Sequence, residues 1–216
     1  MTESSLRRYT AIFGLVGTLI SLTDIPLYFM YDGAPPQWDI LTRVLVGIVG
    51  GTILIVFLVG FRLVICQGRP QLEWAATVVL VSGLMWLTFS MVAQSMEAGT
   101  AIVSKIPIDA TVDGVLAPGQ FLLWGAIGRL MTTLFLSASG FAILRGRFMP
   151  AWLAWLAFLV ALINLAFVPA MFFGYDAAQF YSAVGWGTTA TAPVLVIWWI
   201  IIACIVMLRT PATREA

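Results

Sequence analysis

Six long apolar segments constrain this 216-residue chain more than any other feature. A helix needs about 20 mostly apolar residues to cross a bilayer. The sequence does not show the alternation of polarity that is typical of membrane-barrel strands. We therefore expect an all-α fold, a six-transmembrane-helix bundle that forms one domain over residues 1–216. The predicted helices are residues 9–30, 40–66, 72–96, 119–144, 150–173 and 183–208.

The composition excludes several kinds of chemistry. Hydrophobic residues make up 61% of the chain and charged residues 10%, whereas a soluble domain is about 25% charged. We expect membrane lipids as partners and, at a net charge of +1, no nucleic acid. The chain has no histidine, and its two cysteines, Cys66 and Cys204, lie far apart in the sequence. We therefore expect no metal and no cofactor.

The distribution of basic residues predicts the orientation of the bundle. Cytoplasmic loops of membrane proteins are enriched in Lys and Arg. The ends of the predicted helices that adjoin the two termini hold Arg7, Arg8, Arg62, Arg69, Arg145, Arg147, Arg209 and Arg214. The opposite ends and loops hold Lys105 against Asp32, Asp39, Glu97, Asp109, Asp113 and Asp176. We expect both termini inside, a multi-pass protein of a bacterial cytoplasmic (inner) membrane, and the long connection at residues 95–118 outside.

Ionisable residues inside a membrane segment are rare and usually mark a functional site. Polar residues of the outer halves of the predicted helices are therefore the candidate ligand-binding residues, namely Asp24, Arg43, Glu97, Arg129, Asn164 and Thr188. Two acids face two bases at similar depth, and Asp24 with Arg43 is the pair to test. Three interpretations stay open: a polar cluster that lines an outward-facing cavity, structural ion pairs, or an arginine that extends to the outer headgroups.

Proline and glycine positions add two expectations about packing. Pro26, Pro169 and Pro193 lie in the outer parts of three predicted helices and are expected to kink them. Gly47 and Gly51 form a small-xxx-small pattern, which favours a close helix contact inside the bundle.

Two stretches carry a resemblance to a known family. They are TRVLVG at residues 42–47 and FAILRGRFMPAWLAWLAFLVALINL at residues 141–165. Both resemble a bacterial family of six-helix integral membrane proteins that is catalogued only as a domain of unknown function. Many members carry a further arginine in the third helix, which this chain lacks. The resemblance implies a six-helix fold and no known activity, and it supplies no catalytic residues.

The sequence favours a binding function over an enzymatic one. We expect an outward-facing intramembrane pocket that binds a small anionic amphiphile or lipid, as part of a transporter or a sensor, because arginine suits carboxylate and phosphate groups. Transport by six helices would require a homodimer. One alternative is an accessory subunit of a membrane complex, whose charges only pack helices. The other is a lipid-modifying enzyme that uses Glu97 or Asp24 as acid or base.

Overall fold

The computed structural model describes residues 2–31 and 33–209, so Asp32 and Arg214 lie outside the described residues. Every regular element in these ranges is helical. The elements are α1 (Glu3–Leu22), α2 (Asp24–Tyr28), α3 (Gln37–Cys66), η1 (Pro70–Leu72), α4 (Glu73–Val103), α5 (Ala117–Leu122), η2 (Leu123–Ile127), α6 (Gly128–Gly146), α7 (Ala151–Ala166), η3 (Val168–Phe173), η4 (Gly187–Thr191) and α8 (Ala192–Arg209).

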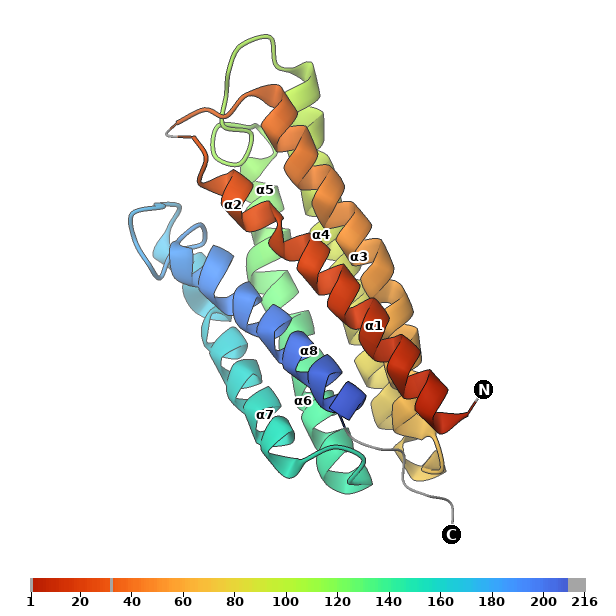
Figure 1. The fold of residues 1–216 in the computed structure, drawn as a ribbon. Helices are drawn as coiled ribbons and strands as arrows, with labels where there is room; N and C mark the ends of the chain where they lie inside the picture. The colour runs from red at the N-terminus through yellow and green to blue at the C-terminus, as the bar shows by residue number, and fades with distance from the viewer. Residues whose placement is uncertain (1, 32, 210–216) are drawn as a thin grey trace.

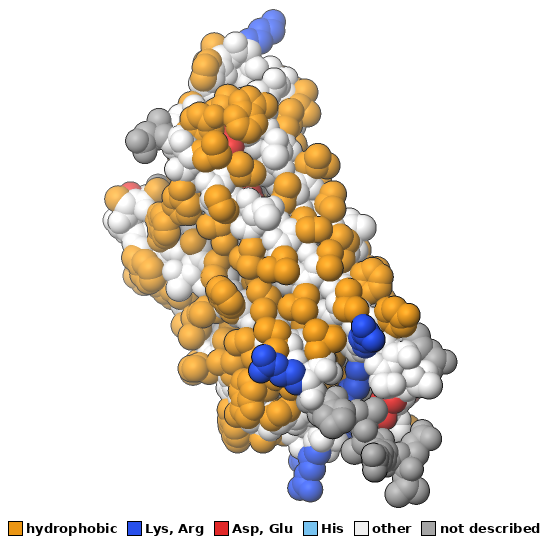
Figure 2. Space-filling view, viewed as in Figure 1, with side chains coloured by type: hydrophobic (Ala, Val, Ile, Leu, Met, Phe, Trp, Pro, Cys, Tyr) orange, Lys and Arg blue, Asp and Glu red, His pale blue; other side chains and the backbone are white. Residues whose placement is uncertain are grey.

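These elements make up 6 spans that are long and apolar enough to cross a membrane. The chain is thus a multi-pass membrane protein, as the apolar segments predicted. Large apolar side chains cover the sides of the molecule, while Lys and Arg gather mainly at its lower end (Figure 2). Lipid contact explains this surface, because a soluble monomer rarely exposes so continuous an apolar area.

The helices pack in a ring. Each span contacts the next in the order α1, α3, α4, α6, α7 and α8, and α8 closes the ring on α1. The first residues of α1 and the last of α8 lie at the same end of the bundle (Figure 1), which we call the terminal end. The opposite end, which holds α2, α5 and the loop between α4 and α5, is the distal end.

The half of the bundle toward the terminal end is an aromatic core. The Trp199 ring lies 6.3 Å from that of Phe61 and 5.8 Å from that of Phe135, measured between centroids, and both pairs are edge-to-face. All three side chains are at most 1% exposed. The Trp199 indole N–H donates to the Leu153 carbonyl at 3.2 Å, which satisfies its one polar group. These three rings therefore form one aromatic cluster whose single polar group is satisfied.

Small residues bring α1 against α3. A Cβ atom at Gly50 would lie 2.9 Å from the Gly17 carbonyl oxygen, and one at Gly17 would lie 3.0 Å from that of Gly50. Such close backbone approach is typical of membrane helix pairs. Gly47 and Gly51 face α4, where they contact Gln94 and Met91. The expected role of this glycine pattern in packing within the bundle is confirmed.

All three intramembrane prolines coincide with a change of helix type. α1 ends before Thr23 and α2 contains Pro26, so the first span is broken close to Asp24. Pro169 lies in the 3-10 segment η3, and Pro193 follows the π-helical segment η4. The expected interruption of these helices is confirmed.

The boundaries differ from the prediction most in α4. This helix continues to Val103, whereas hydropathy ended it at residue 96. The loop that follows is correspondingly shorter and begins at Ser104. The last two turns are polar enough to lower the hydropathy, yet Glu97 and Ala101 are buried against neighbouring helices and keep the helix intact. Glu97 thus lies inside a helix and not at its end.

Candidate functional site

The first polar centre is built around Arg43 of α3. Its guanidinium forms ion pairs with Asp39 on the same helix, at 3.3 Å from Nε, and with Glu97 of α4, at 3.5 Å from Nη2. All three side chains are at most 5% exposed. The guanidinium carbon lies 4.2 Å from the centroid of the Tyr28 ring, a cation-π contact. Arg43 is thus enclosed by two carboxylates and one aromatic face.

The ion pairs lie at a similar depth on two helices. Arg43 is six residues from the start of α3, and Glu97 is six residues from the end of α4. At about 1.5 Å per residue, both lie about 9 Å below the distal ends of their helices. Gln120 of α5 adds a hydrogen bond from its amide nitrogen to the second Glu97 oxygen at 3.4 Å.

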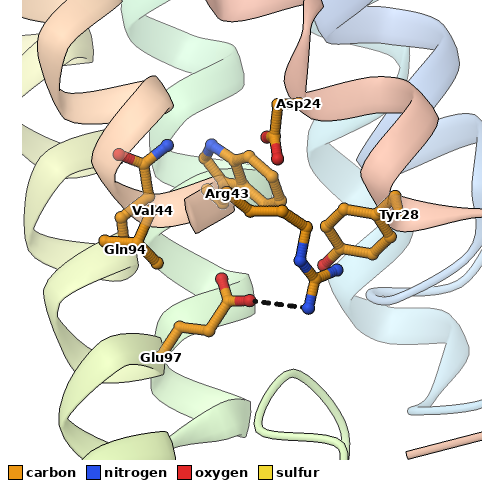
Figure 3. Close-up of a pocket in the computed structure, with 7 residues that line it drawn as sticks. Asp24, Tyr28, Arg43, Val44, Gln94 and Glu97 are labelled. Carbon is orange, nitrogen blue, oxygen red and sulfur yellow. Dashed lines mark ion pairs between the residues drawn. The ribbon is translucent and has the colours of Figure 1, made fainter. Parts of the chain in front are cut away.

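A narrow crevice adjoins this centre, and we call it the acidic crevice. Its empty space is about 200 Å³, part of which is open to the surface, and no point inside is wide enough for a water molecule. Figure 3 shows Asp24 and Gln94 on opposite sides of the Arg43 side chain, with Glu97 and Tyr28 at its guanidinium end. The lining residues are Asp24, Tyr28, Arg43, Val44, Gln94, Glu97 and Trp124.

The crevice has more hydrogen-bond acceptors than donors. Outside the two ion pairs of Arg43, the buried oxygens here without a hydrogen-bond partner are Asp24 Oδ1, Asp39 Oδ1, Gln94 Oε1 and Gln120 Oε1, while Arg43 Nε and Nη2 have only their ion-pair contacts. Three carboxyl groups, those of Asp24, Asp39 and Glu97, lie near a single guanidinium, that of Arg43. Buried acceptors without donors are costly. The surplus of oxygen atoms and of negative charge favours a positively charged or hydrogen-bond-donating occupant.

The second polar centre surrounds Arg129 of α6, deeper in the bundle, and we call it the Arg129 centre. Arg129 is 1% exposed. It donates from Nη1 to the Asn164 side-chain oxygen of α7 at 3.2 Å and from Nη2 to the Trp124 carbonyl at 3.0 Å. Thr132 also donates to the Asn164 oxygen, at 2.9 Å. No ion pair to Arg129 is found within residues 2–31 and 33–209.

Trp124 connects the two centres. Its side chain lines the acidic crevice, while its carbonyl accepts the Arg129 hydrogen bond. It lies in the π-helical segment η2, where Gly125 leaves helical geometry at φ −78° and ψ −106°. A π-bulge releases carbonyls from the regular helix ladder and is frequent at functional sites. Because of the bulge, the Trp124 carbonyl can accept from a side chain five residues later.

Five of the six candidate residues thus separate into two groups. Asp24, Arg43 and Glu97 line the acidic crevice, and Arg129 with Asn164 forms the other centre. The remaining candidate, Thr188 of η4, is buried, donates to the Ser182 carbonyl at 2.8 Å, and lies against Gly125.

The structure shows no direct ion pair between Asp24 and Arg43, the pair that the sequence singled out for testing. Among the described residues, the carboxylates within ion-pair distance of Arg43 are Asp39 and Glu97. Asp24 lies near Arg43 and lines the same crevice, but the break in the first span at Thr23 leaves its carboxylate outside ion-pair distance.

The sequence candidates lacked six residues of the acidic crevice and its surroundings, namely Tyr28, Asp39, Val44, Gln94, Gln120 and Trp124. Asp39 had been assigned to an outer loop, although its spacing of four residues from Arg43 is that of neighbours on one helix face. Gln94, three residues before Glu97, offered the same kind of signal. Tyr28 and Trp124 resemble the other interfacial aromatic residues in the sequence, so only their position in space distinguishes them.

The chain matches no family model and no curated protein, and its fold matches no solved structure. The resemblance based on residues 42–47 and 141–165 therefore stays a prediction. The function has to be argued from the two polar centres themselves.

Proposed function

We propose that this protein binds a small organic cation with an apolar body in the acidic crevice, as the binding unit of a membrane transporter or sensor. The observation that carries the proposal is that Arg43 already has partners, while nearby oxygens lack them. Its guanidinium is already engaged by Asp39, Glu97 and the Tyr28 ring, whereas Asp24 Oδ1 and Gln94 Oε1 have no donor.

The charge balance favours a cation over the anionic amphiphile that the sequence suggested. An anion would have to displace a carboxylate from Arg43 and would meet three carboxyl groups at close range. A cation finds free oxygens and, at Trp124, an aromatic residue that is not engaged by Arg43, and ammonium-type groups prefer such surroundings. No group of three or more His, Cys, Asp or Glu residues in the described chain is placed to hold a metal ion. An organic cation therefore fits better.

The ligand must open the crevice to enter, because the space is too narrow for water as it stands. From the α5–α6 side the crevice is lined by Trp124, which lies in the π-helical segment η2 next to the non-helical Gly125. We propose that a displacement of Trp124 opens the crevice to the ligand.

We also propose the orientation with both termini inside a bacterial cytoplasmic membrane. Among the described residues, the terminal end carries seven arginines in α1, α3, α6, α8 and the loops there. They are Arg7, Arg8, Arg62, Arg69, Arg145, Arg147 and Arg209. The positive-inside rule then places the acidic crevice in the outer half of the bilayer.

Two probes of the same shape and opposite charge test the ligand class. Tetraphenylphosphonium and tetraphenylborate are added to the purified protein in lipid nanodiscs, and binding is followed by calorimetry. We expect the cation to bind saturably and the anion not to bind. Asp24→Asn should weaken cation binding by about tenfold or more, because it removes the carboxylate charge, and a close pair of opposite charges is worth about 1.5 kcal/mol or more.

Asp176→Asn is the matched control, because Asp176 is an exposed acid in the loop before η4. Its variant should bind the cation as the wild type does. Binding of the borate alone would refute the proposal and restore the anionic ligand. Equal binding of both probes would indicate lipid partitioning and would also refute it.

The second candidate is an accessory subunit of a membrane complex. The closed crevice favours it, since ion pairs that fill their own space can serve to fix helix packing. In that case neither probe binds, and a protein partner copurifies in stoichiometric amount from the native membrane.

A further inference from the structure

The acidic crevice and its immediate surroundings hold more carboxyl groups than guanidinium groups. Within it or directly beside it lie the carboxyl groups of Asp24, Asp39 and Glu97 and one guanidinium, that of Arg43. The other buried arginine nearby, Arg129, is held by Asn164 and the Trp124 carbonyl and does not line the crevice. If every carboxyl were ionised, the empty crevice would carry two uncompensated negative charges.

Such a surplus is costly where water does not enter. An isolated carboxylate in a low-dielectric site binds a proton instead of remaining charged. Asp39 and Glu97 each have the Arg43 guanidinium within 3.5 Å, so their charges are partly compensated. Asp24 has no ion pair within 4 Å in the described chain, and its Oδ1 is buried without a donor. A proton on the empty protein is therefore best accommodated at Asp24.

We infer that the organic cation and a proton compete for Asp24, so that binding of one cation releases one proton. This inference rests on the proposed function. In the step, the Asp24 O–H bond breaks, the proton passes to the water at the distal end, and the carboxylate pairs with the cation. The total charge of the crevice is unchanged, and no other bond is made or broken.

The groups that face Asp24 support this exchange. α3 presents Arg43 and Asp39, α4 presents Glu97 and Gln94, and α2 itself presents Tyr28. Because Arg43 is shared between Asp39 and Glu97, it cannot also neutralise Asp24 completely. An external cation can do so, and the cavity walls are otherwise aromatic or apolar. The exchange would let an outer proton concentration regulate occupancy, as in proton-coupled transport.

Calorimetry of the wild-type protein in two buffers measures the exchange directly. Tetraphenylphosphonium is titrated at one pH in phosphate and in Tris, whose ionisation enthalpies differ, and the difference in heat gives the protons released. We expect about one proton per bound cation, and an affinity that rises by about tenfold per pH unit while Asp24 is protonated. The Asp24→Asn variant should bind more weakly and with an affinity independent of pH. Asp176→Asn should keep the wild-type proton release.

The outcomes separate this inference from the proposed function. Cation binding without proton release refutes the exchange and leaves the binding function standing. Proton release that persists in Asp24→Asn refutes the assignment to Asp24. A wild type that binds no cation at any pH refutes the proposed function itself, and the exchange with it.

Discussion

Arg129 provides a test of how a lone arginine is tolerated inside the bundle. Its side-chain acceptor is the Asn164 oxygen, which also accepts from Thr132. Asn164→Leu keeps the side-chain volume but leaves the guanidinium buried with only the Trp124 carbonyl. Loss of a hydrogen bond to a buried charge predicts a destabilisation of about 3 kcal/mol. For a chain of this size, this corresponds to a fall in Tm of about 6–12 °C.

The double variant Arg129→Met with Asn164→Leu should lose far less stability than the single variant Asn164→Leu. Replacing both partners by apolar groups removes the buried charge together with its acceptor, and such exchanges are often nearly neutral. The coupling between the two positions should therefore reach about 2 kcal/mol, inside the usual range for residues in contact.

The free energy of unfolding is measured by denaturant titration in mixed micelles, and Tm is measured with a thiol-reactive dye. Cys204 suits the dye because it is 0% exposed in the folded protein and becomes reactive on unfolding. The single variant Arg129→Met supplies the third corner of the cycle. Additivity of the two single changes within about 0.5 kcal/mol would refute the reasoning, because the two side chains would then act independently.

Two further predictions concern packing and orientation. Gly14→Ala should lower stability by about 1–3 kcal/mol, because a Cβ atom there would lie 2.4 Å from Cys204 Sγ and 2.7 Å from the Phe57 ring. Gly99→Ala, where a Cβ atom meets nothing within 4 Å, should raise stability by about 0.5–1 kcal/mol. Equal thermal shifts in both variants would contradict this packing. Green fluorescent protein fused to the C-terminus should fluoresce and alkaline phosphatase fused there should be inactive, and the reverse result would refute the proposed orientation.

Helix number and approximate span were predictable because apolar length alone determines them. Lipid solvates the sides of the bundle, so a run of about 20 apolar residues has few alternatives to a helix. Apolar length does not predict where a helix ends when its last turns are polar. Hydropathy ended the third span at residue 96, whereas packing of Glu97 and Ala101 carries α4 on to Val103.

The separation of the two polar centres was not predictable. Arg43 and Arg129 both lie in the distal halves of their spans, and depth alone placed them together. Which way each residue faces depends on the rotation of its helix, and nearly uniform apolar faces do not define that rotation. The π-bulge at Gly125 also changes the directions in which the neighbouring side chains point, and a hydropathy pattern does not reveal this change.

Asp39 shows a different kind of failure. The sequence places Asp39 in a loop in water, because it lies next to a polar stretch and just before the second predicted helix, residues 40–66. Local spacing alone could have placed it beside Arg43, because residues four apart on a helix are neighbours. Counting charges indicates only at which end of the bundle Asp39 lies, whereas helix geometry also identifies Arg43 as its partner.

Trp124 complicates the interpretation of any mutational scan of this protein. Trp124 lines the acidic crevice and its carbonyl accepts a hydrogen bond from Arg129, so a displacement of Trp124 would strain a contact outside the crevice. Under the proposed function, we expect substitutions at Arg129 or Asn164 to alter ligand affinity without contact to the ligand. A scan based on affinity alone would count them as contact residues. The two shape-matched probes of opposite charge, whose discrimination depends on the crevice itself, separate residues that touch the ligand from residues that hold Trp124.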